Sequence, residues 1–293
     1  MHRGTLAAVR PGVLVDPELL IGLRPEDRHL LLVRATAPDV VAPARVSHLS
    51  AAVVHGLPVI GAAPDRVDVT DPRRGRTDTT AHTRRRPGGP GADHSAQRWS
   101  SAPCVHDAEC DGAVVTSLVR TLVDVAATKA ALTSVPMIDH ALHDGRVWPE
   151  MLAFEAADGG RDLPQRASAA LSMGSALSGS PAESLCRVRF RQLGTPDPVQ
   201  QHEFRRPGEP PANVDFWFPD QGVVVEVDGR GKYEDAGMLG GASTADAHWR
   251  EKRREDFVRS FPEVRFVLRL TWRDLMHPER VRDALRRAGV PCR

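Results

Sequence analysis

The chain has 293 residues, and its 39 lysines and arginines nearly balance its 38 aspartates and glutamates, for a formal net charge of +1. This balance excludes the strongly basic field of many nucleic-acid-binding proteins, so any contact with phosphate must come from local clusters of charge. The length allows about two domains. There is no signal-peptide core and no run of about twenty apolar residues, which predicts a soluble, cytoplasmic protein with no membrane partner.

The first half of the chain, residues 1–158, is predicted to form a smaller α+β domain. Ser47 has the position of an N-cap in front of a short helix, and an amphipathic helix begins near Thr116. Between these helices, residues 67–70 and 79–84 are expected to form two strands on either side of an arginine-rich turn.

A linker and a helix start mark the second domain. Residues 159–179 are rich in alanine, serine and glycine without a clear period, and they are predicted to connect the first domain to residues 180–293. Ser180 and Pro181 have the residue types of an N-cap and a first helical position. Glu183 has two interpretations of equal weight: it closes a capping box with Ser180, or it belongs to a metal site.

A β-hairpin is predicted between Asn213 and Asp228. Its two strands alternate apolar and polar residues on either side of a turn at residues 219–222. Pairing the apolar faces sets Asp215 opposite Glu226, with Asp228 on the same side. Like charges directly opposite each other destabilise a sheet, so a cation between them is expected. Mg²⁺ suits this place, because it prefers one or two carboxylates together with water and substrate phosphate.

The remaining elements define the sheet. Residues 245–261 are predicted to form a charged helix and residues 264–270 a strand, so the second domain runs helix, three strands, helix, strand, and then a last helix that Thr271 caps. Because a helix connects them, the third and fourth strands are expected to be parallel within a mixed sheet. Four basic residues of the charged helix are the best candidates for contact with nucleic acid: Arg250, Lys252, Arg253 and Arg254.

The α/β order of the second domain, Glu183, Asp215 and the run from Glu226 to Lys232 resemble the restriction-endonuclease-like superfamily, which carries PD-(D/E)xK motifs. The branch that the chain looks most like is that of the very-short-patch-repair endonucleases. The resemblance implies an αβββαβ core that cleaves DNA with Mg²⁺ or Mn²⁺, and a lysine that orients the attacking water. The implied metal ligands are three carboxylates of the hairpin: Asp215, Glu226 and Asp228.

The lysine departs from the family pattern. In the superfamily it lies two residues after the acidic residue of the third motif, and here that position is Asp228. Three alternatives stay open: Lys232 takes over after a glycine-rich turn, Lys252 reaches the site from the charged helix, or the site is inactive. Lys232 is preferred because it follows the strand directly.

The first half resembles AbiEi-like antitoxins in two segments, residues 47–58 and 116–126. That family usually begins with a winged helix-turn-helix, whereas residues 1–16 look like the wing alone, so this truncated remnant is not expected to read an operator by itself. The leading prediction is a Mg²⁺-dependent DNA endonuclease. The alternative is a non-catalytic regulator of the antitoxin kind, which binds nucleic acid or a toxin partner.

Overall fold

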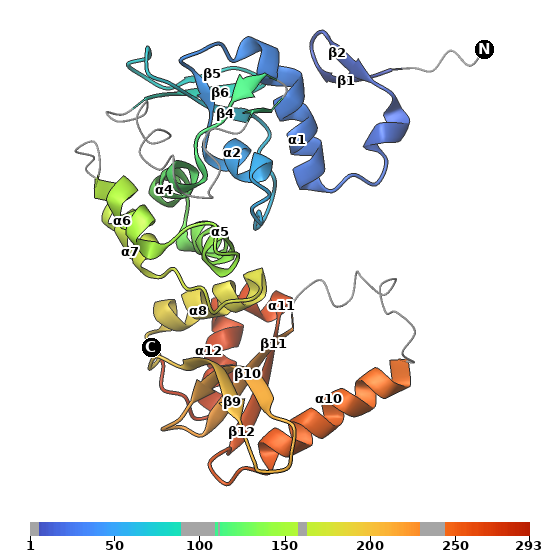
Figure 1. Ribbon diagram of the computed structural model, residues 1–293, viewed down its shortest axis with the longest axis vertical. Helices are drawn as coiled ribbons and strands as arrows, with labels where there is room; N and C mark the ends of the chain where they lie inside the picture. The colour runs from blue at the N-terminus through green and yellow to red at the C-terminus, as the bar shows by residue number, and fades with distance from the viewer. Residues whose placement is uncertain (1–5, 89–108, 111, 158–162, 229–243) are drawn as a thin grey trace. The chain divides into compact units, whose positions relative to one another are not determined.

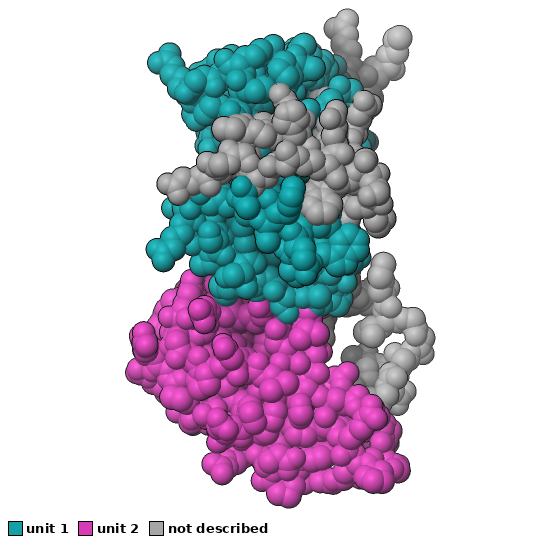
Figure 2. All heavy atoms as spheres, turned by 60° about the vertical axis from the view of Figure 1, so that its left-hand side comes forward, with its two compact units in different colours: residues 1–176 teal, residues 177–293 magenta. Residues whose placement is uncertain are grey.

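The computed structural model of the chain describes residues 6–88, 109–110, 112–157, 163–228 and 244–293. The chain divides into two compact units, residues 1–176 and 177–293 (Figure 2). None of the helices formed by the described residues is long and apolar enough to cross a membrane.

The amino-terminal unit contains a small four-stranded sheet of order β3-β4-β6-β5 (Figure 1). Strands β4 and β6 are parallel, and each edge strand is antiparallel to its neighbour. The strands of the sheet are β3 (Arg45–Val46), β4 (Val67–Asp71), β5 (Asp78–Thr79) and β6 (Thr83–Pro87). Two hairpins accompany it: β1 (Ala7–Arg10) with β2 (Val13–Val15), and β7 (Glu109–Cys110) with β8 (Ala113–Val114).

Helices form the rest of this unit and supply most of its core. The 3-10 turns are η1 (Pro17–Leu20) and η2 (Ala37–Asp39), and the helices are α1 (Pro25–Thr36), α2 (His48–Val54), α4 (Leu118–Thr128), α5 (Ala131–His143), α6 (Pro149–Ala157) and α7 (Gln165–Ser172). Leu118, Leu122, Met137 and Ile138 are almost completely buried in one apolar cluster. Ser47 has the predicted N-cap position in front of α2, but its side chain makes no capping hydrogen bond. The helix predicted near Thr116 is α4, and the Ser117 side chain caps it by accepting the N–H of Arg120.

The stretch predicted as a linker, residues 159–179, contains a helix. Within it, α7 packs against α4 and α5 and buries Ala167 and Ala170. Small side chains carry little hydrophobic signal in a sequence, yet they let a helix approach its neighbours closely. The alanines that suggested a linker are therefore part of the amino-terminal unit, which extends to residue 176. The prediction that this unit is the smaller of the two is wrong, because the carboxyl-terminal unit covers only residues 177–293.

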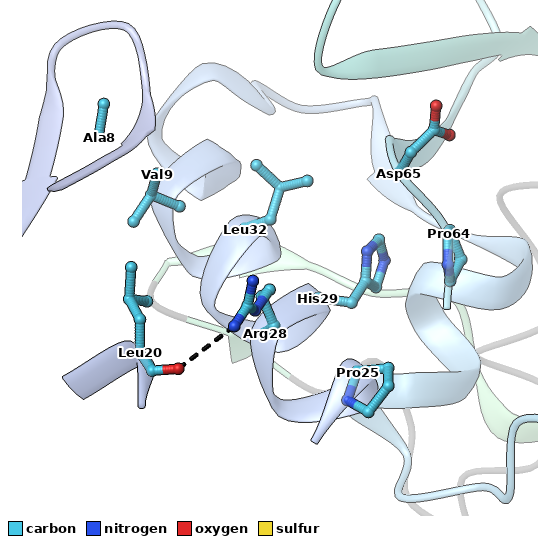
Figure 3. A pocket seen from close by; sticks show the side chains of 9 residues that line it. All are labelled: Ala8, Val9, Leu20, Pro25, Arg28, His29, Leu32, Pro64 and Asp65. Atoms are coloured by element: carbon cyan, nitrogen blue, oxygen red, sulfur yellow. Dashed lines mark hydrogen bonds between the residues drawn. The ribbon is translucent and has the colours of Figure 1, made fainter. Parts of the chain in front are cut away.

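Helix α1 lines a pocket of about 180 Å³ in this unit (Figure 3). Arg28 donates from Nη2 to the carbonyl oxygen of Leu20 at 3.2 Å. The neighbouring His29 is buried, and its Nε2 lies 2.9 Å from the Ser50 hydroxyl. The His29 side chain thus connects the wall of the pocket to α2.

The carboxyl-terminal unit has the predicted order of elements. They are α8 (Pro181–Leu193), β9 (Val199–Phe204), β10 (Ala212–Phe218), β11 (Val223–Asp228), α10 (Thr244–Arg259), β12 (Phe266–Thr271), α11 (Trp272–Leu275) and α12 (Pro278–Arg287). The sheet has the order β12-β11-β10-β9, with β11 and β12 parallel and the other pairs antiparallel (Figure 1). This confirms the α/β class and the mixed sheet.

The hairpin of β10 and β11 has the predicted register where the two strands are paired. Phe216 lies opposite Val225, and Phe218 lies opposite Val223. Phe190 of α8 meets both phenylalanine rings edge-on, with ring centroids 5.2 and 5.3 Å apart. Edge-to-face contacts are a preferred arrangement of aromatic rings in a core. Helix α8 therefore covers the apolar face of the hairpin.

Helix α10 packs against the other face of the sheet. Its Val258 belongs to one buried cluster with Trp217 and Val224, which alternate with the residues under α8. Asp215 and Glu226 have the same alternation as Trp217 and Val224, so the sequence pattern directs both carboxylates towards this second face.

The last predicted helix is divided into two. Thr271 caps α11 through a capping box with Asp274, as expected. The helix then ends, and α12 begins at Pro278. Proline has no N–H to donate and is tolerated in the first helical turn, so it starts a new helix here and does not continue the old one.

Candidate functional site

Asp215 is held at the point where the pairing of β10 and β11 reaches Phe216 and Val225. Its Oδ2 accepts the backbone N–H of Val227 at 2.7 Å. A side chain thereby takes the place that a backbone carbonyl has in a regular ladder. This contact fixes the Asp215 carboxylate between the two strands of the hairpin.

The surroundings of Asp215 are unfavourable for its negative charge. Burial raises the pKa of the Asp215 carboxyl above its ordinary value, and the charge of Glu183 adds to the rise. The Val227 N–H, the charge of Arg254 and a hydrogen bond with Glu226 act in the opposite direction, but burial prevails. A perturbed carboxyl among other charged groups is a feature of functional sites, although structural networks also produce it.

Glu183 belongs to the N-terminal cap of α8. The Ser180 hydroxyl accepts the Glu183 N–H at 3.2 Å and donates to Glu183 Oε1 at 2.7 Å. The other carboxylate oxygen, Oε2, accepts the N–H of Gly179 at 3.0 Å. Glu183 thus takes part in the cap through the Ser180 hydroxyl, but its carboxylate accepts the N–H of Gly179 and not that of Ser180, so the predicted capping box is incomplete. The charge of Glu183 also acts on Asp215.

Arg254 pairs with Glu226 across the sheet face. Its Nη2 lies 2.8 Å from Glu226 Oε1, and its Nη1 donates to the carbonyl oxygen of Asn213 on β10. Arg254 was expected to meet nucleic acid as part of a basic run, and its guanidinium is instead directed at the carboxylate group. The described part of the site thus combines three carboxylates with one guanidinium: Glu183, Asp215, Glu226 and Arg254.

Lys252 lies on a different side of α10 from Arg254. Two residues along a helix are separated by about 200° around its axis. The Lys252 Nζ lies 5.4 Å from the centroid of the Trp249 ring, and both side chains are exposed. Arg253 is exposed as well.

The other predicted residues are only partly described. Asp228 ends β11, opposite Thr271 of β12, and its side chain is half-buried. The side chain of Arg250 and the whole of Lys232 lie outside the described residues. The predicted roles of these residues stay predictions.

Two residues of the site were missed by the sequence analysis. Gln201 on β9 has a φ of 49°, in the left-handed region, and its Nε2 donates to Glu183 Oε2 at 2.9 Å. Cys186 of α8 is completely buried, and burial, with the charges of Asp215 and Glu183, raises the pKa of its thiol well above the ordinary value. No motif marks either residue, because each joins the site only through the packing of α8 on the sheet.

No group of three or more histidine, cysteine, aspartate or glutamate side chains within the described ranges is arranged to hold a metal ion. The proposal of Asp215, Glu226 and Asp228 as metal ligands therefore stays a prediction. In comparisons with known proteins, no family model, curated protein or solved structure matches the chain.

Proposed function

We propose that this chain is a Mg²⁺-dependent endonuclease that hydrolyses phosphodiester bonds in DNA. The observation that carries the proposal is the half-buried Asp215 carboxyl, whose pKa is raised by burial and by the charge of Glu183 and which shares a hydrogen bond with Glu226. Buried charges are normally paired with an opposite charge. When all three carboxylates are ionised, they and the guanidinium of Arg254 sum to two negative charges, which a divalent cation would balance. Without a cation, the hydrogen bond between Asp215 and Glu226 requires a proton on one of the two carboxyl groups.

The chemistry of these donors fits Mg²⁺ or Mn²⁺. Both ions prefer hard oxygen ligands, and Mg²⁺ is usually bound by one or two carboxylates while it keeps several waters. Asp215 and Glu226 would be the ligands, with Asp228 assisting from the end of β11. When bound, the metal would activate a water and stabilise the charge on the scissile phosphate.

The residues of the chain have separate tasks in this proposal. The Val227 N–H orients the Asp215 carboxylate, and Arg254 orients Glu226. Lys232 positions the attacking water. The exposed Lys252 and Arg253 on α10, together with Arg250, meet the DNA backbone, where lysine and arginine supply most of the sequence-independent affinity.

The alternative is a non-catalytic regulator of the antitoxin kind, which binds nucleic acid or a toxin. The observation that favours it is the ion pair between Arg254 and Glu226, because it engages a carboxylate that metal binding needs. The direction of Lys252 towards Trp249 favours it as well. In this alternative the carboxylate group only supports the fold.

Plasmid cleavage separates the two functions. The purified full chain should nick supercoiled DNA with Mg²⁺ or Mn²⁺ and should be inactive in EDTA. Glu226→Gln should lose the activity, because the amide carries no negative charge for the metal. Asp256→Asn is the matched control, since Asp256 is an exposed carboxylate on α10 and its loss should leave cleavage intact. Binding of DNA without metal-dependent cleavage by the wild type would support the regulator.

Metal binding itself should be visible as stability. A ligand that binds only the folded state stabilises it by about 2.7 kcal/mol at a hundredfold excess over the dissociation constant. Thermal melts in EDTA and in Mn²⁺ should show this difference for the wild type and for Asp256→Asn, but not for Glu226→Gln. Equal melting temperatures of the wild type with and without Mn²⁺ would remove the support for a metal site.

A further inference from the structure

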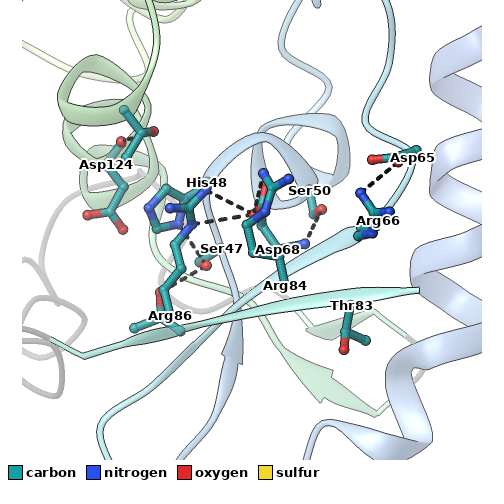
Figure 4. A network of polar contacts seen from close by, with 12 residues as sticks. Ser47, His48, Ser50, Asp65, Arg66, Asp68, Thr83, Arg84, Arg86 and Asp124 are labelled. Carbon is teal, nitrogen blue, oxygen red and sulfur yellow. Dashed lines mark hydrogen bonds and ion pairs between the residues drawn. The ribbon is translucent and has the colours of Figure 1, made fainter. Parts of the chain in front are cut away.

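A second cluster of charged side chains lies in the amino-terminal unit, around His48 at the start of α2 (Figure 4). In the parallel pair of β4 and β6, Asp68 is opposite Arg84 and Thr70 is opposite Arg86. Residues directly opposite in a sheet point to the same face, so these four side chains share one face. The cluster has no part in the site of the carboxyl-terminal unit.

Hydrogen bonds to Ser50 of α2 and to Ser47, which precedes the helix, connect α2 to β4. The Ser50 hydroxyl accepts the backbone N–H of Asp68 at 2.8 Å, and the Thr70 hydroxyl donates to the Ser47 hydroxyl at 2.9 Å. These hydrogen bonds are buried. They hold His48 in place above β4 and β6.

Two arginines converge on one carboxylate oxygen. Nη1 of Arg84 lies 3.8 Å and Nη2 of Arg86 lies 3.4 Å from Oδ1 of Asp68. Strong charge-assisted hydrogen bonds are about 2.7–2.9 Å long, so neither contact is close. The Asp68 side chain is 3% exposed, whereas those of Arg84 and Arg86 are 33% and 22% exposed. Two partly exposed guanidiniums thus share one buried anion, and the three groups together carry a positive charge.

His48 brings an N–H donor to the same place. Thr70 donates to Ser47, so the Ser47 proton is available for Nδ1 of His48, 2.9 Å away. Burial lowers the pKa of His48, which favours the neutral ring. A neutral ring that accepts the Ser47 proton at Nδ1 carries its own proton on Nε2. Figure 4 shows the ring between Asp124 of α4 and Arg86 of β6. Oδ1 of Asp124 in turn accepts a hydrogen bond from Nε of Arg120 at 2.8 Å.

The backbone of His48 is strained. Its φ is 53°, in the left-handed region that glycine adopts readily and histidine adopts less often. Strain of this kind persists where the surrounding contacts hold it, and it is common at ligand sites. A glycine would remove the strain and would also remove the imidazole.

We infer that Arg84, Arg86 and His48 form a binding site for a phosphate group, with Asp68 as the residue that positions both arginines. A tetrahedral phosphate has enough oxygens to accept from two guanidiniums and an imidazole N–H together, whereas a planar carboxylate has two. Its negative charge matches the excess positive charge of the arginine pair.

Titration of the full chain with inorganic phosphate, at constant ionic strength, tests the site. Calorimetry should show saturable binding and thermal melts should show a higher melting temperature, while acetate should have a much smaller effect. Arg86→Gln should weaken phosphate binding about tenfold or more, as expected for the loss of a hydrogen bond to a charged group. Arg84→Gln should do the same and serves as the second variant, because its side chain is the more exposed of the two.

Arg85→Gln is the matched control. Arg85 lies between the two on β6, points to the opposite face and donates to the carbonyl oxygen of Asp39 at 3.1 Å. The Arg85→Gln substitution removes the same charge, but this variant should bind phosphate like the wild type. The inference is wrong if the wild type shows no saturable binding, or if folded Arg84→Gln and Arg86→Gln bind as tightly as Arg85→Gln.

Titration with three compounds shows which kind of molecule carries the phosphate group. A 5′-phosphorylated oligonucleotide, the same oligonucleotide with a 5′-hydroxyl, and a nucleoside monophosphate are titrated into the wild type. Tightest binding of the phosphorylated oligonucleotide supports a nucleic-acid end as the ligand. Tightest binding of the monophosphate supports a small phosphate compound. Equal binding of the two oligonucleotides, unchanged by Arg86→Gln, contradicts the site.

Discussion

At the scale of single residues, Asp215 determines how the candidate site responds to pH. Burial and the charge of Glu183 raise its pKa in the folded state above that in the unfolded chain. A carboxyl of this kind favours the folded state when it is protonated. The contribution of this carboxyl to folding stability is fully present below its pKa in the unfolded chain, about 3.9. It is lost as the pH rises through the higher pKa of the folded state.

Asp215→Asn should therefore be more stable than the wild type at pH 7 without metal. The amide keeps an oxygen for the Val227 N–H and removes the half-buried charge. The difference should shrink as the pH is lowered through the raised pKa of Asp215, because the wild-type carboxyl then also becomes neutral. Urea denaturation at several pH values measures it, with the exposed Asp256→Asn as the control. A wild type that is the more stable protein at every pH contradicts this account of Asp215.

At the scale of secondary structure, the turn between β10 and β11 is set by Gly222. Its φ is 66°, and a Cβ added there would lie 2.5 Å from the carbonyl oxygen of Glu263. Its own carbonyl oxygen accepts the N–H of Arg265 at 2.7 Å, which joins the turn to the chain that leads into β12. The turn residue thus holds two segments of the sheet together.

Gly222→Ala should destabilise the carboxyl-terminal unit more than Gly208→Ala. Gly208 has a φ of 81° with nothing within 4 Å of an added Cβ, so its substitution costs only the left-handed strain, about 1–2 kcal/mol. Gly222→Ala adds a clash with a backbone atom that cannot move without disturbing the hydrogen bond to Arg265. Chemical denaturation of the two variants gives both values. Equal losses would mean that the chain around Glu263 adjusts freely.

At the scale of the whole molecule, the division into two units predicts separable responses. Leu185, Phe216 and Leu270 are among the most buried side chains, and all belong to residues 177–293. The groups of the candidate metal site belong to the same unit, and those of the phosphate site belong to residues 1–176.

Residues 177–293 expressed alone should therefore unfold cooperatively and should keep the stabilisation by Mn²⁺. Residues 1–176 should respond to phosphate and not to Mn²⁺. Thermal melts of each fragment with each ligand measure this, with the full chain as the reference. A Mn²⁺ response that appears only in the full chain would show that the first unit contributes to the metal site.

Local patterns in the sequence were enough to predict several elements of the second unit. The alternation of Phe216, Phe218 and the valines of β11 permits one register that buries both apolar faces, because a shift by one residue reverses every side chain. The caps at Ser180 and Thr271 involve residues three positions apart in the chain. Pro278 begins α12 and marks the break in the last predicted helix.

The sequence by itself determined the order of the elements, the α/β class and the pairing within the hairpin, because each depends on neighbours along the chain or on a repeating period. Only the tertiary structure decided which side chains meet. Arg254 faces Glu226 while Lys252 faces Trp249, and Gln201 reaches Glu183. These contacts depend on how α8 and α10 are turned against the sheet. That orientation results from the packing of the whole core, and no local pattern encodes it.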